Sequence, residues 1–198
     1  MADNRALFFF DYVDATSWVV ELWLAELLPL DGITVDRRPF ELKPPPEVFL
    51  GPSDPEWATS RSWAIPTLEA MGRTLANPSL VPWTRKAHEL ALHAAREGCY
   101  EHIHAALFKT FHEDGADIGR IDVLVSIAAS AGLDTSESKA VLDVDRYADE
   151  VCEARREAEE LGVRGAPTIL AGHKRLERPQ GFDELRTFLT SLGGGPDR

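Results

Sequence analysis

Segments with strand-forming patterns lie only near the two ends of this chain, and this distribution most constrains its fold. Near the N-terminus, Leu7–Val13 is an apolar run, Ser17–Leu28 has apolar residues at helical spacing, and Ile33–Leu42 alternates apolar with polar residues. A strand, a helix and a second strand in this order favour parallel strands joined by a right-handed crossover. We therefore expect the chain to open with a β-α-β unit.

A long helical block follows this unit. Between Asp54 and Leu161 we find helical patterns and no strand pattern. The clearest predicted helices, with a highly charged one last, are Lys86–Glu97, Tyr100–Phe111, Val123–Ala131 and Asp143–Leu161.

The strand patterns return after the helical block. Thr168–Ala171 and Lys174–Glu177 are short candidate strands on either side of Gly172-His173, which is typical of a hairpin turn. An amphipathic helix is predicted over Phe182–Leu192. The element order is thus β-α-β, helices, then β-β-α. This order predicts an α/β protein with an all-helical insertion between its two halves.

The charge balance argues against two classes of partner. The chain has 198 residues, with 33 Asp and Glu against 21 Lys and Arg, and its net charge is −12 at pH 7. This charge repels phosphate backbones and anionic lipid, so we expect neither a nucleic-acid partner nor a membrane partner. With 44% apolar residues, the chain can bury a core without a metal or a disulfide.

Targeting and metal-binding signals are not found. The apolar run near the N-terminus is too short for a signal peptide and is interrupted by Asp11, and no stretch approaches the ~20 apolar residues that cross a bilayer. Cys99 and Cys152 are far apart, and His102 and His104 point different ways on a helix. We therefore expect a cytoplasmic protein with free thiols, no metal and no bound cofactor, although glutathione is considered below.

A segment before the third predicted strand makes a family resemblance specific. Residues 162–168 read Gly-Val-Arg-Gly-Ala-Pro-Thr, and this segment resembles the one that carries the cis-proline in DsbA-type proteins. The residues FDYVDATSW at 10–18 and the segments 87–90, 131–134 and 181–185 fit the same family. Over nearly its whole length, the chain resembles the FrnE-like branch of the DsbA family, together with hydroxychromene-carboxylate isomerases and kappa-class glutathione transferases.

The resemblance implies a thioredoxin fold. Residues 1–50 and 163–198 would form a discontinuous thioredoxin-like domain, and residues 51–162 would form a helical insertion, or lid. In this family the turn at the cis-proline faces the N-terminus of the first helix. The resemblance therefore implies a cleft between residues 14–17 and the turn at 166–167.

The junction after the first strand departs from the family in the residues that carry its chemistry. FrnE-like proteins have Cys-Pro-Trp-Cys there, and the glutathione-using relatives have Ser-Pro-Tyr-Ser. This chain has Asp14-Ala15-Thr16-Ser17, and Trp83 replaces an Asn of the family's lid motif. Because dithiol exchange needs two thiols at the junction, we expect the protein to be redox-inactive by the family mechanism.

Asp14, at the first catalytic position, has two interpretations. Asp is a preferred N-cap residue, whose carboxylate accepts hydrogen bonds from the first backbone N–H groups of a helix. Alternatively, the carboxylate acts as a general base or as a fixed charge in a pocket. A helix N-terminus stabilises the ionised form, so we expect a lowered pKa and a poor base.

Ser17, at the second catalytic position, has three interpretations. It is a first-turn hydroxyl without a role, a donor to a bound glutathione thiolate, or a nucleophile. The resemblance to kappa-class transferases implies the second role, but their key serine occupies the position of Asp14, and a carboxylate there repels a thiolate. A nucleophilic role is disfavoured because no base is evident beside Ser17.

The remaining candidate residues concern ligand binding. In the family, the backbone of the residue before the cis-proline pairs with a peptide or with glutathione, a role that Ala166 and Pro167 would take here. Alternatively, Pro167 only shapes the start of its strand. Trp18 and His88 are candidates for the cleft wall, against a core position for Trp18 and a surface or capping position for His88.

Three functions follow as hypotheses. The first is a binding or regulatory protein whose cleft holds a small molecule, glutathione or an extended peptide. The second is a glutathione-dependent isomerase or transferase that acts on a small aromatic substrate with Asp14 and Ser17. The third is an oxidoreductase that uses Cys99, Cys152 or a thiol of a partner. A homodimer is compatible with each of them.

Overall fold

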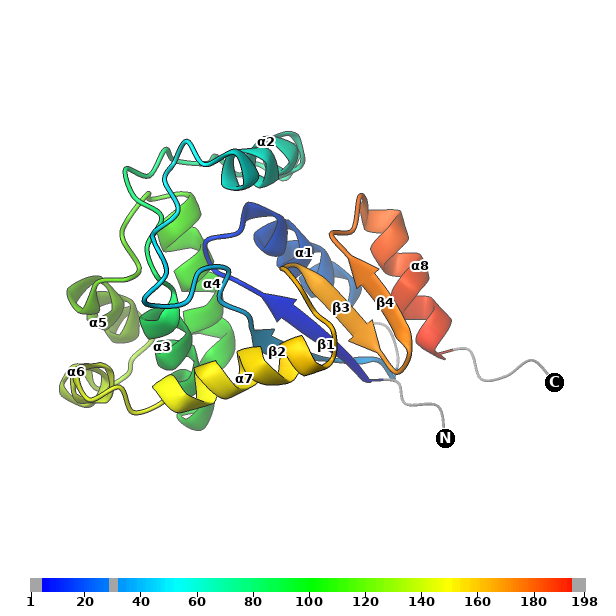
Figure 1. Cartoon of the computed structure of the whole chain (residues 1–198). Helices are drawn as coiled ribbons and strands as arrows, with labels where there is room; N and C mark the ends of the chain where they lie inside the picture. The colour runs from blue at the N-terminus through cyan, green and yellow to red at the C-terminus, as the bar shows by residue number, and fades with distance from the viewer. Residues whose placement is uncertain (1–4, 29–31, 194–198) are drawn as a thin grey trace.

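The computed structural model describes residues 5–28 and 32–193, in which a four-stranded sheet is surrounded by helices (Figure 1). Its helices and strands are β1 (Arg5–Phe10), α1 (Ala15–Leu27), β2 (Thr34–Pro39), α2 (Pro55–Ala70), α3 (Arg85–Arg96), α4 (Tyr100–His112), α5 (Ile121–Ser130), α6 (Thr135–Asp143), α7 (Ala148–Glu160), β3 (Thr168–Ala171), β4 (Lys174–Glu177) and α8 (Phe182–Gly193).

The sheet has the strand order β2-β1-β3-β4. β1 and β2 are parallel, whereas β3 is antiparallel to both β1 and β4. The β-α-β opening and the hairpin near the C-terminus are therefore confirmed. Gly172 lies in the hairpin turn with φ of 59°, a conformation that glycine adopts without strain.

Alternating side chains of β1 supply the two faces of the sheet. Phe8 and Phe10 belong to the larger core cluster, which also contains residues of α1, α3, α4 and α8. Phe9 belongs to a smaller cluster on the other face, with Leu170 of β3 and Ala158 of α7. In Figure 1, α7 runs along this second face. Helices of the predicted insertion thus contribute to the cores on both sides of the sheet.

The helical block lies between β2 and β3, as predicted, but it contains more helices than the sequence indicated. The charged stretch Asp143–Leu161 is not one helix: α6 ends at Asp143 and α7 begins at Ala148. Asp145, between them, has a φ of 53°, which is incompatible with a continuous right-handed helix. The division into domains at residues 50/51 and 162/163 stays a prediction.

The strand predicted over Leu7–Val13 ends earlier, at Phe10. Asp11 turns the chain away from the sheet, because its C=O accepts a hydrogen bond from the N–H of Asp14 and its carboxylate accepts one from the N–H of Leu42. This turn positions the N-terminus of α1. Within the described ranges, no helix is both long and apolar enough to span a membrane.

Candidate functional site

Asp14 is the N-cap of α1. Its backbone is extended, with φ −89° and ψ 114°. Carboxylate oxygen Oδ2 accepts hydrogen bonds from the backbone N–H and the hydroxyl of Ser17, at 2.6 and 2.7 Å. The capping interpretation of Asp14 is confirmed.

Two more hydroxyl groups surround the other carboxylate oxygen of Asp14. Oδ1 accepts hydrogen bonds from Thr16 Oγ1 at 3.0 Å and from Ser60 Oγ at 2.5 Å. Ser60 belongs to α2 and lies 46 residues along the chain, so no local sequence pattern pointed to it. We call Asp14, Thr16, Ser17 and Ser60 the hydroxyl shell. It connects the junction to the helical block.

The pKa of Asp14 is raised, and the prediction of a lowered pKa is wrong. Burial disfavours the charged form, and this effect exceeds the opposing effect of the hydrogen bonds from Ser60, Ser17 and Thr16. Only 3% of the residue is exposed, a degree of burial that the sequence did not reveal. The carboxyl group is therefore a better proton acceptor than a solvent-exposed cap.

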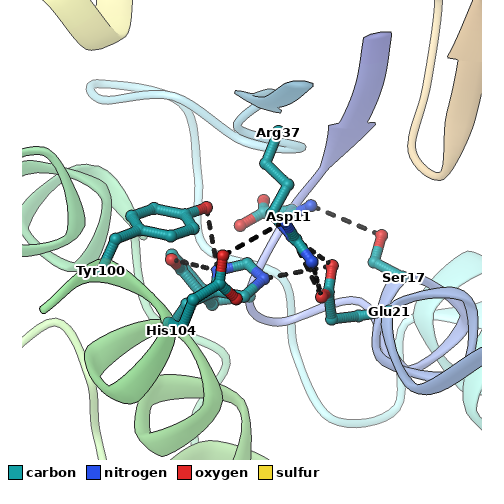
Figure 2. A network of polar contacts seen from close by, with 8 residues as sticks. Asp11, Ser17, Glu21, Arg37, Tyr100 and His104 are labelled. Atoms are coloured by element: carbon teal, nitrogen blue, oxygen red, sulfur yellow. Dashed lines mark hydrogen bonds and ion pairs between the residues drawn. The ribbon is translucent and has the colours of Figure 1, made fainter. Parts of the chain in front are cut away.

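Ser17 is fully buried. Its hydroxyl donates to Asp14 and lies 3.4 Å from the backbone N–H of Asp11, as a hydrogen-bond acceptor. Figure 2 shows this second contact, with Ser17 on the first turn of α1. Its hydroxyl thus holds the junction together, which fits a structural role better than a nucleophilic one.

A cavity of about 180 Å³ lies beside the hydroxyl shell. Asp14 and Ser60 line it from the junction, and Gly165 and Ala166 line it from the segment before β3. The peptide bond between Ala166 and Pro167 is cis. The structure thus brings residue 14 and the turn at 166–167 to one cavity, as the resemblance implies.

The rim of this cavity is basic. The lining residues include one acid, Asp14, and four cations: Lys43, Arg155, Arg164 and Arg178. This excess contrasts with the net charge of −12 of the whole chain. An anionic group is therefore the ligand chemistry that the rim favours.

Arg155 contacts both an aromatic ring and an acid. Its guanidinium lies over the ring of Phe40, which also lines the cavity, with 4.7 Å between the guanidinium carbon and the ring centroid. Nε donates to Glu159 at 3.0 Å, whereas the buried Nη1 has no hydrogen-bond partner among the described residues. A buried donor without a partner is costly.

Trp18 and His88 do not line the cavity, so their assignment to its wall is wrong. Trp18 is 4% exposed and stacks on His112, with ring centroids 5.1 Å apart. Burial, with a smaller contribution from Arg61, lowers the pKa of His112 to about 3, so its ring is neutral in this stack. The stack belongs to the core.

His88 is fully buried, in contrast to the predicted surface or capping position. Its Nε2 lies 3.4 Å from Oδ1 of Asp11, and its ring packs on Phe10 and Tyr12. His88 sits on α3 and is not among the residues that line the cavity.

A second buried polar network lies further along α1 (Figure 2). Glu21 accepts three hydrogen bonds from Arg37, at 3.0, 3.0 and 2.6 Å, and its Oε2 lies 3.2 Å from Nε2 of His104. Nδ1 of His104 lies 2.8 Å from the hydroxyl of Tyr12 and 3.2 Å from that of Tyr100. We call this set the Glu21 network. The sequence did not predict it, since its members come from α1, β2, α4 and the turn that follows β1.

Glu21 has a lowered pKa despite its burial. Burial alone would raise the pKa, but the hydrogen bonds and charges of His104 and Arg37 together outweigh it. Glu21 therefore stays ionised, and it ties α1 to β2 and α4.

The two cysteines lie outside these networks. Cys99 and Cys152 are free thiols, Cys99 half-buried and Cys152 exposed. Neither lines the cavity beside Asp14. In the part of the chain that the structure describes, no group of three or more His, Cys, Asp or Glu residues could hold a metal ion.

Comparisons with known proteins agree with this geometry. The family model of the DSBA-like thioredoxin domain matches residues 6–193. The uncharacterized protein YwbO of Bacillus subtilis is 30% identical over 182 residues, which are 87% of this chain and 89% of that protein.

Solved structures with low sequence identity share the fold. The probable DsbA oxidoreductase SCO1869 of Streptomyces coelicolor has a TM-score of 0.84 and 23% identity, over 98% of this chain and 92% of that one. A 2-hydroxychromene-2-carboxylate isomerase has a TM-score of 0.77 and 17% identity, over 96% and 94%. The cytosolic disulfide reductase DsbM of Pseudomonas aeruginosa, solved with GSH, has a TM-score of 0.69 and 16% identity, over 94% and 98%.

Proposed function

The chain belongs to the DSBA-like thioredoxin domain family, and from this premise we propose that it is a ligand-binding member that does not exchange disulfides at the family's site. The observation that carries the proposal is the hydroxyl shell. A buried carboxylate with four hydroxyl and backbone hydrogen bonds stands where the family's reactive thiol would be. It lies on a cavity with a basic rim.

Thiol–disulfide exchange requires a thiolate that attacks a disulfide sulfur. Residues 14–17 contain no sulfur, and the N-terminus of α1 is occupied by the carboxylate of Asp14. Cys99 and Cys152 are not part of the cavity. The oxidoreductase hypothesis would need one of these thiols, or a thiol of a partner, to act elsewhere on the molecule.

Size and charge support a small anionic ligand. A dry apolar cavity of about 150 Å³ binds benzene, so the cavity of about 180 Å³ accommodates one group of that size. The cations of the rim favour a carboxylate over a neutral group, and Arg155 is one of the four that line the cavity. The cavity is too small for a whole glutathione molecule or an extended peptide, so it would admit only one side chain or a terminal carboxylate of either ligand.

A second function is favoured by the raised pKa of Asp14. A carboxyl group that holds a proton more tightly is a better general base, as an isomerase acting on a small aromatic substrate needs. Asp14 lines the cavity, so its carboxyl group is the candidate for this role. In this alternative Ser17 positions the carboxylate, and glutathione would be a cosubstrate.

Thermal unfolding separates these functions, because a ligand that binds only the folded state raises the unfolding temperature. We expect benzoate to stabilise the protein and the neutral match benzamide to do so much less. Substituting Arg155→Met should remove the benzoate effect, whereas Arg156→Met, on an exposed neighbour, should not. Stabilisation by glutathione but not by benzoate would favour the isomerase or transferase alternative.

Insulin reduction tests the redox part of the proposal. We expect no turnover by the wild-type protein, and turnover would support the oxidoreductase hypothesis instead. The double substitution Asp14→Cys with Ser17→Cys should introduce disulfide exchange, because it places a thiol at the N-terminus of α1. A well-folded double variant without activity would contradict the assigned geometry.

We also propose that the protein is cytoplasmic and that it can form a homodimer. The two free thiols and the fold shared with the cytosolic disulfide reductase DsbM support a cytoplasmic protein. A homodimer would leave the cavity beside Asp14 complete in each subunit, since one chain supplies all its lining residues.

A further inference from the structure

We propose that a second cavity, lined by Phe49 and Trp83, binds a small neutral aromatic molecule. This cavity, which we call the Trp83 cavity, has a volume of about 460 Å³ and shares no lining residue with the cavity beside Asp14. Its volume falls in the range of roughly 300–1,000 Å³ that is usual for small-molecule sites. A dry cavity of about 150 Å³ holds benzene, so the Trp83 cavity has room for a larger aromatic molecule.

Phe49 and Trp83 form an aromatic wall of this cavity. Their ring centroids are 4.3 Å apart, with 33° between the ring planes. Trp83 Nε1 donates a hydrogen bond to the C=O of Glu47 at 3.0 Å, which orients the indole ring and leaves its apolar surface for a ligand. Because aromatic rings prefer stacked or edge-to-face neighbours, a ring of the ligand would extend this pair.

The other apolar residues of the Trp83 cavity complete a concave surface. They include Pro45, Leu80 and Pro82. A Cβ at position 119 would lie 2.9 Å from Cβ of Pro82, so Gly119 permits a close approach of the segment before α5. Phe49 and Leu80 are nevertheless 42% and 37% exposed. An apolar ligand that covers these two side chains removes apolar surface from water, which is favourable.

The charged residues of the Trp83 cavity already have partners in the protein. Its three cations are ion-paired, Arg85 with Glu41, Lys86 with Glu89 and Asp145, and Arg120 with Asp122. Of its two acids, Asp145 is one of these partners, and Asp117 accepts a hydrogen bond from the backbone N–H of Gly119 at 2.8 Å. A charged ligand would lose its hydration without gaining an unpaired counter-ion. The cavity therefore favours a neutral molecule.

The test of the ligand class is a calorimetric titration of the full chain with 2-naphthalenemethanol at pH 7. We expect this probe to bind, and its saturated match decahydro-2-naphthalenemethanol to bind about two- to tenfold more weakly, because aromatic pairing adds to the energy of burial. Failure of 2-naphthalenemethanol to bind, or equal binding of the saturated match, would overturn the proposal.

Competition for the bound probe tests the charge of the ligand. The anion 2-naphthoate and the cation 2-naphthylmethylammonium should each displace 2-naphthalenemethanol with an affinity at least roughly tenfold below that of the neutral 2-naphthamide, since each charge would be buried without a partner. Displacement by either ion with the affinity of the amide would overturn the assignment of a neutral ligand.

A matched pair of variants tests the location. Phe49→Ala removes one ring of the aromatic wall and should weaken the binding of 2-naphthalenemethanol about tenfold. Leu161→Ala, at an apolar residue that is 50% exposed and does not line the cavity, should leave the affinity unchanged. If Phe49→Ala does not fold, Leu80→Ala shortens another exposed wall residue and should weaken binding about threefold. Unchanged affinity in a folded wall variant would overturn the proposed site.

Discussion

Two buried carboxylates of α1 have nearly the same exposure and opposite pKa shifts. Asp14 is 3% exposed and its pKa is raised, whereas Glu21 is 8% exposed and its pKa is lowered. Asp14 is surrounded by hydroxyls and a backbone N–H, and Glu21 by a guanidinium and an imidazole. The difference teaches that the partners of a buried carboxylate, rather than its burial, decide whether it can accept a proton.

The contrast has a simple electrostatic cause. Burial removes water from both carboxylates and penalises their charged forms. The hydrogen bonds from hydroxyl groups offset only part of the desolvation cost of the charged form of Asp14. The full positive charge of Arg37 offsets this cost for Glu21. The Glu21 network therefore suits a structural clamp, and the hydroxyl shell suits a site that exchanges protons or binds ligands.

The largest expected effect comes from breaking the clamp. Glu21→Ala should lower the free energy of unfolding by about 3–5 kcal/mol, because it leaves the buried Arg37 without its partner. Urea unfolding followed by circular dichroism measures this change. Glu26→Ala, on an exposed position of the same helix, is the control and should stay within about 0.5 kcal/mol of wild type. A loss no larger than that of the control would mean that the network is not a clamp.

A smaller effect is expected from removing the cap. Asp14→Ala should lower the free energy of unfolding by about 1–2 kcal/mol, since both the cap and the acceptor of the buried hydroxyls are lost. Asp134→Ala removes a similar but exposed cap of α6, whose carboxylate accepts from the N–H of Glu137 at 2.8 Å. The difference between the two variants, from the same urea titrations, measures the hydroxyl shell. Equal losses would show that the shell adds nothing to a simple cap.

Removal of a single hydroxyl should have a smaller effect still. Ser60→Ala deletes one hydrogen bond to Asp14 and should cost about 0.5–1.5 kcal/mol, as a typical hydrogen bond does. It should also raise the pKa of Asp14 further, because the bond from Ser60 lowers that pKa. Carboxyl titration by NMR of the wild type and the variant measures the shift. A fall in the pKa would contradict the role given to Ser60.

The least visible effect is the pH dependence of stability, which should have opposite signs for the two carboxylates. Above the ordinary pKa of 3.8, native Asp14 holds its proton more tightly than the unfolded chain, so its contribution to stability falls as the pH rises through its raised pKa. Below the ordinary pKa of 4.5, native Glu21 holds its proton less tightly, so its contribution grows as the pH rises toward 4.5.

Unfolding free energies of the wild type, Asp14→Asn and Glu21→Gln between pH 3 and 7 check these signs. The difference between wild type and Asp14→Asn should decrease with rising pH, and the difference between wild type and Glu21→Gln should increase. If both differences in unfolding free energy changed in the same direction with rising pH, the two carboxylates would not have opposite pKa shifts.

Much of the fold was predictable because it depends on local patterns. The apolar run of β1, the hairpin around Gly172 and the helical spacing of α3 and α4 can be recognised from residues that are neighbours in the sequence. The cleft between residue 14 and the turn at 166–167 was predictable only through the resemblance, because no local pattern relates segments so far apart in the chain.

The details of the site were not predictable, since they depend on distant contacts. Ser60 completes the hydroxyl shell from α2, and Arg37 reaches Glu21 from β2. The buried position of His88 and the raised pKa of Asp14 likewise follow from how the helical block packs against α1 and β1. Burial of a polar side chain among residues from several elements leaves no periodic signal in the sequence.

The hydrogen bond from Ser60 to Asp14 also has an evolutionary consequence. The hydroxyl of Ser60 is satisfied here because the carboxylate of Asp14 accepts its hydrogen bond, at 2.5 Å. A homologue that carries cysteine at position 14 offers a sulfur, which is a weaker acceptor than a carboxylate, so serine at position 60 would stabilise it less. Among homologues, serine at position 60 should therefore accompany an acid at position 14 more often than it accompanies cysteine.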